Sequence, residues 1–173
     1  ALFTRPEMKV ERVSYEVPTP SAARGLIEAI YWKPAIRWVV DRIHVLNPIV
    51  FTNIRRNEVS EKISTELAKS AMRGKSNPDL FVDVTAARQQ RASMVLTDVD
   101  YVFELHFEMV PEKSGAEDTP EKHYNIVLRR LRTGQHYAQP TLGTREFPAQ
   151  VSLIEKSAIP KSALEGTSDL GWM

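Results

Sequence analysis

The sequence predicts an α+β fold in a single domain, on the strength of three observations. The chain has 173 residues and a hydrophobic fraction of 42%, which suits one globular domain with a real core. Two segments carry apolar residues at helical spacing between clear start and stop signals. Several others alternate apolar and polar side chains, as half-buried strands do. The expected order is helix, strand, strand, a long insertion, strand, helix and strand.

The first helix is expected to begin at Pro20, with Thr19 as its N-cap, because proline suits the first helical position. Pro34 ends it, since the residue before a proline is pushed toward extended geometry. The apolar stripe that would face the core consists of Ala23, Leu26, Ile27 and Ile30.

The second helix is expected from Pro120 to about Arg132, with a similar start. Thr119 supplies the N-cap and Pro120 the first helical position. Gly134 follows as the C-cap glycine, because glycine readily adopts the left-handed conformation that ends many helices.

Two strands are expected between the helices, in residues 36–45 and after Pro48. Apolar residues alternate through the start of the first one, and a turn or register shift near Asp41 and Arg42 resets the alternation. The second strand follows Pro48 and is expected to end at Ile54.

The clearest strand covers residues 101–109. One face carries Tyr101, Phe103, Leu105, Phe107 and Met109. Glu104, His106 and Glu108 share the other face, where successive side chains stand roughly 6.5–7 Å apart. That spacing is too wide for three ligands on one ion without a bend, so no metal site is expected. A turn and a final strand are expected in residues 142–155.

Residues 60–91 are polar, rich in lysine and serine, and weakly patterned, which predicts an insertion or loop. The stretch "EKISTELAKSAMR" suits a short helix, and "GKSNPD" would break it. With one more strand before residue 1, the element order becomes the split β-α-β-β-α-β pattern of a ferredoxin-like fold.

The composition excludes several classes of site. The chain has no cysteine, so it can form neither a disulfide framework nor a thiolate metal site, which fits a reducing cytoplasm. No apolar run is long enough to span a bilayer, so we expect a soluble, cytoplasmic protein without a membrane partner. The phosphate-binding, dinucleotide and zinc-protease motifs are all absent, and no cofactor is expected.

The charge pattern changes sign at the start of the second helix. Residues 98–121 hold eight acidic side chains and one basic one, whereas residues 122–145 hold five basic side chains and no acidic one. Lys122 and His123 lie in the first helical turn, where a cation costs roughly 0.3–1 kcal/mol. A phosphate bound at this helix start would explain both residues. The alternatives are a solvated helix surface and an exposed Lys–His pair.

Other side chains suit contacts with RNA. Tyr31 ends the first helix, either as a tyrosine at the core edge or with its phenol reaching a cleft. Tyr124, His136 and Tyr137 offer surfaces on which bases can stack. The cations expected to contact the RNA backbone are Lys33, Arg55, Arg56, Arg129, Arg130, Arg132 and Arg145.

Four segments in order resemble one known family. They are "VSYEVPTPSAARGLIEAIYWKPAI", "DRIHVLNPIVFTNIRRNEV", "EKHYNIVLRRLRTGQH" and "LGTREFPA", and together they are similar to the CRISPR-associated Cas-five family, subtype I-C (the d subtype). The resemblance runs over essentially the whole chain. It implies one ferredoxin-like domain of the RNA-recognition type (RAMP) over residues 1–173, with an insertion at about 60–91. Relative to the family, the sequence lacks the first strand and a stretch after Met173. A chain that truly started at Ala1 is therefore expected to be unstable or inactive.

The resemblance also implies an activity. Members are metal-independent endoribonucleases that cut precursor CRISPR RNA at the base of the repeat hairpin, keep its 5′ handle, and join the backbone and large subunits of type I-C Cascade in antiviral defence. The family's catalytic tyrosine falls on Tyr31 in "AIYWKP", and its lysine and histidine fall on Lys122 and His123 in "EKHY". We expect Lys122 to stabilise transition-state charge and His123 to transfer a proton. Tyr31 would orient or help activate the attacking 2′-hydroxyl, and which of Tyr31 and His123 is the base stays open.

Two alternatives remain at this stage. The chain is either the nuclease or a non-catalytic scaffold that binds CRISPR RNA in the same complex, and retention of the tyrosine, lysine and histidine favours the nuclease. An unrelated ferredoxin-like interaction module would require the four-segment match to be a coincidence. Whether DNA is a further partner, and what residues 60–91 contact, stays open.

Overall fold

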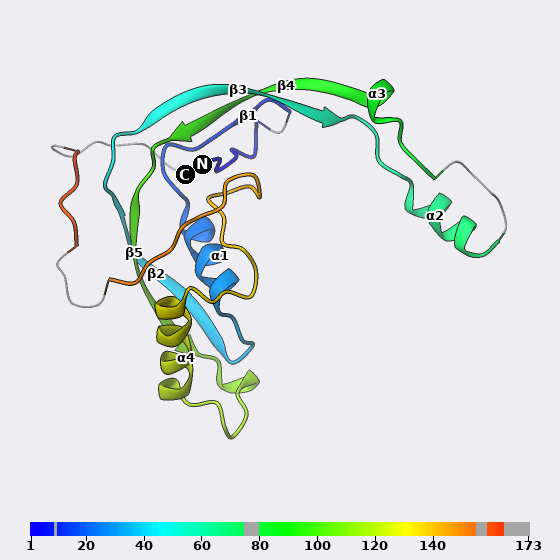
Figure 1. The fold of residues 1–173 in the computed structure, drawn as a ribbon. Helices are drawn as coiled ribbons and strands as arrows, with labels where there is room; N and C mark the ends of the chain where they lie inside the picture. Colours follow the sequence, from blue (N-terminus) through cyan, green and yellow to red (C-terminus); the bar gives the residue numbers. More distant parts are fainter. Residues whose placement is uncertain (9, 75–79, 155–158, 165–173) are drawn as a thin grey trace. The chain divides into compact units, whose positions relative to one another are not determined.

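The computed structural model describes residues 1–8, 10–74, 80–154 and 159–164 and shows a mixed α+β fold (Figure 1). This confirms the predicted fold class in its coarse form. The elements in chain order are β1 (Arg12–Val13), α1 (Pro20–Ile30), β2 (Ile36–Val45), β3 (Val50–Val59), α2 (Thr65–Met72), α3 (Val84–Ala87), β4 (Arg88–Thr97), β5 (Tyr101–Met109), the 3-10 turn η1 (Pro111–Lys113) and α4 (Pro120–Thr133).

The chain forms two compact units. Unit 1 consists of residues 1–52 and 94–173, and unit 2 consists of residues 53–93. Strands β3 and β4 belong partly to each unit, while α2 and α3 lie wholly in unit 2. A single domain with an insertion at about 60–91 stays a prediction. Among the helices that the structure describes, none is long and apolar enough to cross a membrane.

Both principal helices begin at the predicted residues and α4 ends at the predicted glycine, whereas α1 ends at Ile30, before the stop expected at Pro34. The Thr19 hydroxyl accepts a hydrogen bond from the Ala22 N–H at the start of α1. At the start of α4, the Thr119 hydroxyl accepts one from the Lys122 N–H. Gly134 ends α4 in the left-handed conformation, with φ of 68°, which its lack of a Cβ atom permits. The predicted caps are therefore confirmed.

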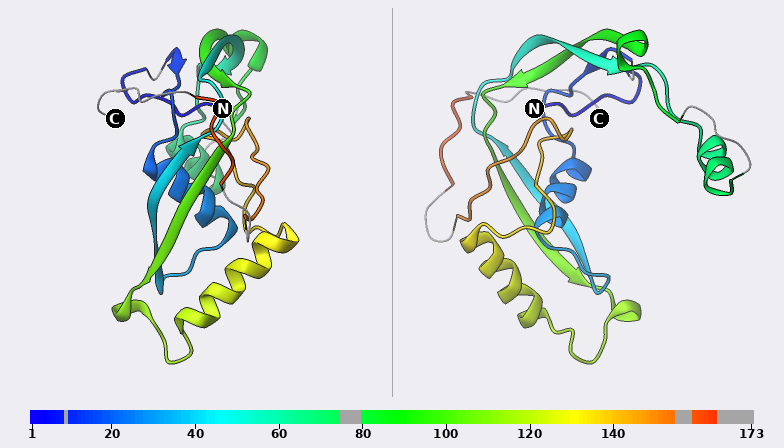
Figure 2. Two further views of the ribbon diagram at one scale, coloured as in Figure 1. Left: turned by 90° about the vertical axis from the view of Figure 1, so that its left-hand side faces the viewer. Right: turned by 45° about the vertical axis from the view of Figure 1, so that its right-hand side comes forward.

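Strands β2 and β5 pair antiparallel from Ile36 opposite Met109 to Val45 opposite Tyr101, and they lie side by side in both views of Figure 2. A register shift interrupts the ladder between Val40 and Arg42, which confirms the predicted irregularity. The shift leaves the apolar residues on both sides of it facing the same way.

The main core of unit 1 lies between this two-stranded ladder and both principal helices. Buried residues of α1, of β2 and of α4 contribute to one cluster, and the apolar face of β5 packs against it. The cluster includes Leu26, Ile27, Ile30, Tyr31, Ile36, Trp38, Val127 and Ala149. A second, smaller cluster gathers around Phe3 and Leu96.

Three strand predictions need correction. The second predicted strand does not end at Ile54, because β3 continues to Val59 and contains Arg55 and Arg56. The segment predicted as a loop up to residue 91 instead opens strand β4 at Arg88. No strand forms between residues 142 and 154, where Gly143 makes an isolated bridge to Leu2 and Pro148 makes another to Thr141.

The described strands form a three-stranded sheet in the order β1-β4-β3 and the two-stranded sheet β2-β5. These sheets confirm neither the four-stranded order of a ferredoxin-like fold nor its RNA-recognition subtype, so both stay predictions. Residue 155, the last residue of the predicted final strand, lies outside the described residues.

Gly143 and Gly25 should respond oppositely to alanine. Gly143 has φ of 95° and its backbone touches Leu2, so a Cβ atom there would overlap the Leu2 carbonyl. We expect Gly143→Ala to lower the free energy of unfolding by at least about 2 kcal/mol. Gly25 lies inside α1 with open space around it, so Gly25→Ala should raise that free energy by about 0.5–1 kcal/mol. Urea unfolding measures both, and equal effects would contradict the expectation.

Tyr101 should make stability fall at alkaline pH. Burial raises the pKa of its phenol to about 12, whereas an unfolded tyrosine has a pKa of about 10. Above pH 10 the unfolded chain loses this proton first, so the free energy of unfolding decreases as pH rises from about 10 to 12. Unfolding measured from pH 9 to 12 should show a smaller decrease in Tyr101→Phe than in the unsubstituted protein, and identical slopes would refute this.

Candidate active site

Tyr31 turns into the core at the end of α1. It is the C-cap residue, with extended backbone geometry, and its N–H donates to the Ile27 carbonyl. Its own carbonyl accepts a hydrogen bond from Trp38 Nε1 at 2.9 Å, which ties the end of α1 to β2. The residue is only 2% exposed. The tyrosine is thus a core residue whose phenol still has a polar partner.

That partner is His123, in the first turn of α4. Tyr31 Oη lies 2.8 Å from His123 Nδ1, and the histidine is 1% exposed. The edge of the imidazole packs against Phe107 of β5, with ring centres 6.3 Å apart. The idea of an exposed Lys–His pair is therefore wrong for His123. The hydrogen bond joins the end of one helix to the start of the other across the core.

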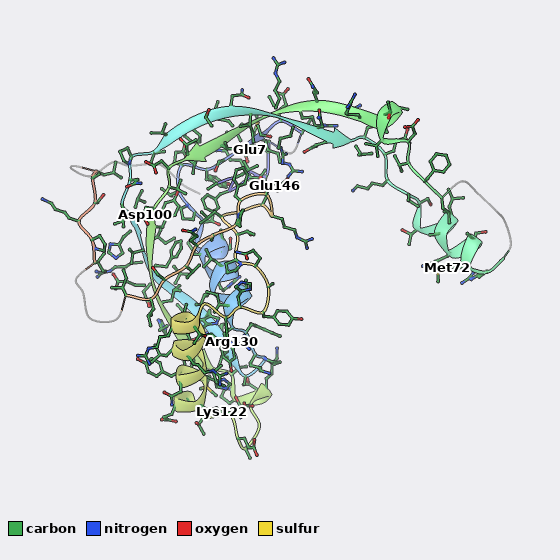
Figure 3. The ribbon with its side chains drawn as sticks, in the orientation of Figure 1. Glu7, Met72, Asp100, Lys122, Arg130 and Glu146 are labelled. Carbon is green, nitrogen blue, oxygen red and sulfur yellow. The ribbon has the colours of Figure 1, made fainter. Side chains whose placement is uncertain are left out.

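Lys122 points the other way, toward the acidic segment before the helix. Its side chain is 44% exposed, and Nζ donates to the Glu117 carbonyl at 3.1 Å. The Glu117 carboxylate lies 3.9 Å from Nζ, and the Asp118 carboxylate lies 4.0 Å from it. Figure 3 labels Lys122 near the start of α4. Nearby carboxylates thus offset the cost of a cation at this end of the helix.

Asp118 is the residue that the sequence analysis missed. Its Oδ1 atom lies 3.4 Å from His123 Nε2, and its Oδ2 atom accepts a hydrogen bond from the Gly115 N–H at 2.9 Å. The Gly115 N–H lowers the pKa of this carboxyl most, and the charges of Lys122, His123 and Lys33 lower it further. Its position just before the N-cap, in an acidic run, was the available signal, because such a carboxylate faces the first turn.

Arg130 covers the other side of the tyrosine. Its guanidinium carbon lies 5.1 Å from the centre of the Tyr31 ring, and Nη1 donates to the Ile30 carbonyl. Burial raises the pKa of the Tyr31 phenol, the Arg130 charge partly opposes that effect, and Asp118 adds a smaller increase. The phenol is therefore neutral near pH 7 and can donate a proton or a hydrogen bond.

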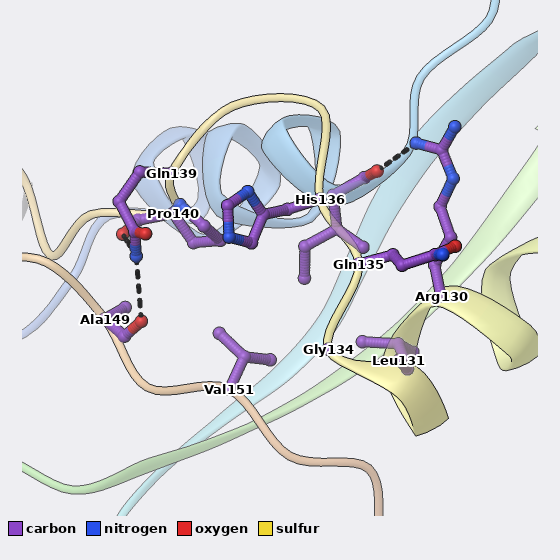
Figure 4. Close-up of a pocket in the computed structure, with 10 residues that line it drawn as sticks. Arg130, Leu131, Gly134, Gln135, His136, Gln139, Pro140, Ala149 and Val151 are labelled. Carbon is purple, nitrogen blue, oxygen red and sulfur yellow. Dashed lines mark hydrogen bonds between the residues drawn. The ribbon is translucent and has the colours of Figure 1, made fainter.

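A pocket of about 180 Å³ lies behind Arg130, between the end of α1 and the segment that follows α4 (Figure 4). Ile30, Leu131 and Val151 supply apolar walls, and Gln135, His136 and Gln139 supply polar edges. The N–H groups of Tyr137 and Ala138 both donate to the Ala29 carbonyl, which fixes the loop against α1. The Tyr137 side chain is 87% exposed.

The remaining predicted cations divide between the two units. Lys33, Arg129, Arg132 and Arg145 are exposed in unit 1. Arg55 and Arg56 belong to unit 2, where Arg55 is exposed. Arg56 is half-buried, donates to Ser93 Oγ at 3.0 Å and pairs with Glu58 at 2.7 Å. Arg56 therefore already has protein partners, which makes it less available to bind a phosphate.

The acidic face of β5 is paired across the ladder. His44 contacts Glu104, Arg37 contacts Glu108 and Asp41 contacts His106. Among the described residues, no three histidine or carboxylate side chains gather closely enough to hold a metal ion. These side chains thus form cross-strand pairs.

Comparison with known proteins identifies the family. The family model described as CRISPR-associated protein (Cas_Cas5), in its Cas_Cas5d form, matches residues 1–173. The chain belongs to this family. A relative from Mannheimia succiniciproducens, named CRISPR pre-crRNA endoribonuclease Cas5d, is 52% identical over all of this chain and 78% of its own length. A relative of the same name from Thermus thermophilus is 47% identical over 88% of this chain and 59% of its own length.

Two solved structures resemble the fold. A crystal structure titled CRISPR-associated protein has a TM-score of 0.59, and that of a functionally uncharacterized protein from Streptococcus mutans has 0.53. Each is 27% identical and covers 90% of this chain and 62% of its own chain. The chain thus spans roughly three fifths of these structures and of the Thermus relative. The resemblance inferred from the four sequence segments is confirmed.

Removing the Tyr31 hydroxyl should weaken the fold as well as the site. Tyr31→Phe leaves His123 Nδ1 buried without its partner, so we expect the free energy of unfolding to fall by about 1–3 kcal/mol. Tyr137→Phe is the matched control, since its exposed hydroxyl should contribute less than about 0.5 kcal/mol. Denaturant unfolding of both variants measures this, and a Tyr31→Phe variant as stable as the unsubstituted protein would show that the hydrogen bond is dispensable.

Proposed function

We propose that the protein containing this chain is a metal-independent endoribonuclease that cuts precursor CRISPR RNA at the base of its repeat hairpin. The observation that carries the proposal is the buried Tyr31–His123 hydrogen bond beside Lys122, at the N-terminus of α4. The N–H groups at a helix start attract a phosphate, and Lys122 adds a positive charge there. Both curated relatives are named CRISPR pre-crRNA endoribonuclease, which supports RNA cleavage.

The reaction is an attack of the substrate's own 2′-hydroxyl on the adjacent phosphorus. The O2′–P bond forms and the P–O5′ bond breaks, and the leaving 5′-oxygen takes a proton from water, which gives a 2′,3′-cyclic phosphate and a 5′-hydroxyl. The Tyr31 oxygen receives the 2′-hydroxyl proton while its own proton passes to His123 Nδ1, 2.8 Å away. Lys122 stabilises the charge that develops on the phosphorane oxygens. In this arrangement Tyr31 orients the nucleophile and His123 is the final base.

Substrate access requires a local movement in this proposal. Tyr31 and His123 are almost fully buried, and the acidic segment 115–118 lies against Lys122 and His123. A phosphate that binds Lys122 replaces the Glu117 carbonyl and carboxylate as the partner of the lysine ammonium group. The lysine side chain then turns toward the phosphate and opens the path to the tyrosine hydroxyl, while the Gly115 N–H keeps Asp118 facing His123.

The wider RNA contacts follow from the exposed cations. The exposed cations Lys33, Arg129, Arg132 and Arg145 in unit 1 and Arg55 in unit 2 neutralise backbone phosphates, whereas the half-buried Arg130 and Arg56 contribute only through their remaining exposed surface. The pocket behind Arg130 and the exposed Tyr137 ring suit unpaired bases. On this proposal the full ferredoxin-like, RNA-recognition fold keeps the 5′ handle and joins the backbone and large subunits of type I-C Cascade. DNA is a further partner to test.

A second candidate function is a non-catalytic scaffold that binds CRISPR RNA in the same complex. The burial of Tyr31 and His123 favours it, because a buried Tyr–His pair can serve the fold alone. Under this alternative Lys122 only positions a phosphate. The two functions differ in whether the RNA is cut.

Cleavage of a labelled repeat hairpin by the full-length protein in EDTA decides between them. We expect a cyclic phosphate product from the unsubstituted protein and none from a hairpin with a 2′-deoxy residue at the cut site. His123→Ala should lower the cleavage rate about 10²–10⁴-fold while the hairpin still binds.

Lys122→Ala tests the same site without a buried substitution, and exposed Lys113→Ala is its matched control. Lys122→Ala should slow cleavage and Lys113→Ala should not. Binding without cleavage by the unsubstituted protein would establish the scaffold instead. Cleavage of the 2′-deoxy hairpin would contradict the proposed chemistry.

A further inference from the structure

One polar atom in the core is poorly satisfied. His123 Nε2 is buried and makes no hydrogen bond within the described part of the chain. Its nearest charged neighbour is Asp118 Oδ1 at 3.4 Å, slightly beyond an ordinary hydrogen bond. Burying a polar nitrogen without a hydrogen-bond partner lowers the stability of the fold. The Asp118 carboxylate is the group that faces this nitrogen, so its role has to be explained.

The Asp118 carboxylate is held in place by its own turn. Oδ2 accepts from the Gly115 N–H at 2.9 Å, and the Asp118 N–H donates to the Gly115 carbonyl at 3.0 Å. These two bonds close the segment 115–118 and leave Oδ1 directed at the imidazole. Glu117, its neighbour, has no such anchor among the described residues, and its side chain is 94% exposed.

An ionised carboxylate can only accept hydrogen bonds, so it attracts a proton on the nitrogen that faces it. The Asp118 carboxylate, 3.4 Å away, therefore favours the tautomer with the proton on Nε2. Nδ1 is then an acceptor, so the Tyr31 hydroxyl must donate to it. The order of donors and acceptors runs from the tyrosine through the imidazole to the carboxylate.

We propose that Asp118 is a positioning residue that holds His123 in the Nε2–H tautomer, so that Nδ1 is free to take the proton of Tyr31. The inference rests on the proposed function for its kinetic consequence. Asp118 need not touch the RNA. It acts through His123, by setting its tautomer and by stabilising the imidazolium that forms when Nδ1 is protonated.

The charges around the carboxylate agree with this role. Lys122 and Lys33 also act on Asp118, and the low pKa of its carboxyl keeps it ionised at neutral pH. Arg130 lies on the opposite side, over the tyrosine ring. When a phosphate binds Lys122, that lysine no longer has to neutralise Asp118, so the carboxylate remains for His123.

Asp118→Asn in the full-length protein tests the proposal, with Glu117→Gln as its matched control. The asparagine oxygen can still accept from Gly115, but its NH₂ group faces Nε2 and favours the opposite tautomer. We expect the single-turnover cleavage rate to fall about 10²–10³-fold, with the hairpin dissociation constant changed less than about threefold. Glu117→Gln removes an equal charge from beside Lys122 but not from His123, so its cleavage rate should stay within about threefold.

A second readout does not depend on activity. The ¹⁵N chemical shifts of labelled histidine side chains distinguish the two tautomers, and the His123→Ala variant identifies its signals among the four histidines. The unsubstituted protein should show His123 protonated on Nε2, and Asp118→Asn should move the proton to Nδ1. This measurement still decides if the variant folds poorly, because the unsubstituted tautomer is itself a test.

The outcomes separate the two proposals. If His123→Ala abolishes cleavage but Asp118→Asn cuts normally, the positioning role is wrong and the nuclease stands. If both acidic variants slow cleavage equally, the effect is general charge near Lys122, and the positioning role is again wrong. If the unsubstituted protein never cuts, the nuclease is wrong, and the tautomer alone supports or overturns the role of Asp118 in holding His123.

Discussion

The hydrogen bond between Tyr31 and His123 is the contact on which the described structure of the site depends. It connects residues 92 positions apart in the sequence, one at the end of α1 and the other in the first turn of α4. Neither group can lose the other without leaving a polar atom in a closed core. The requirements of the fold and those of the proposed chemistry therefore fall on the same pair of atoms.

When no substrate is bound, the acidic segment before α4 supplies the negative charge that balances the helix start. Positive charge from the helix N-terminus and from Lys122 accumulates there, and without substrate the carboxylates of Glu117 and Asp118 balance it. A phosphate would take over that balancing role. The local charges are thus compatible with a stable free protein and with a bound phosphate at Lys122.

The sequence predicted those parts of the fold that depend on interactions between residues close together in the chain. The caps of both helices depend on single residues such as Thr119 and Gly134, so the sequence was sufficient for them. Strand β4 was missed because its first half, "RQQR", is polar and shows no alternation. The final strand did not form, because its apolar alternation alone does not provide a partner strand.

For the site, the sequence pointed to the residues but not to their directions. Lys122 and His123 are adjacent, yet one faces the acidic segment and the other the core, which depends on how α4 rotates against β5. The sequence alone did not distinguish Asp118 from the neighbouring acidic residues, because its contact with His123 forms only when the 115–118 turn closes. The geometry of this local turn, not the spacing of the acidic residues, selects Asp118.

The register shift in β2 has a consequence for how the chain finds its fold. Strands β2 and β5 are far apart in the sequence, so the entropy cost of closing the chain between them makes their pairing slow compared with local contacts. The pairing must also avoid neighbouring misaligned registers. If the alternation continued without the shift at Val40, Arg42 and His44 would point into the core and Ile43 would point out. A slipped pairing would therefore bury charge along half the strand. The register shift therefore favours one alignment of β2 with β5 over the slipped alignments. It helps the ladder that supports both helices to form with the correct pairing.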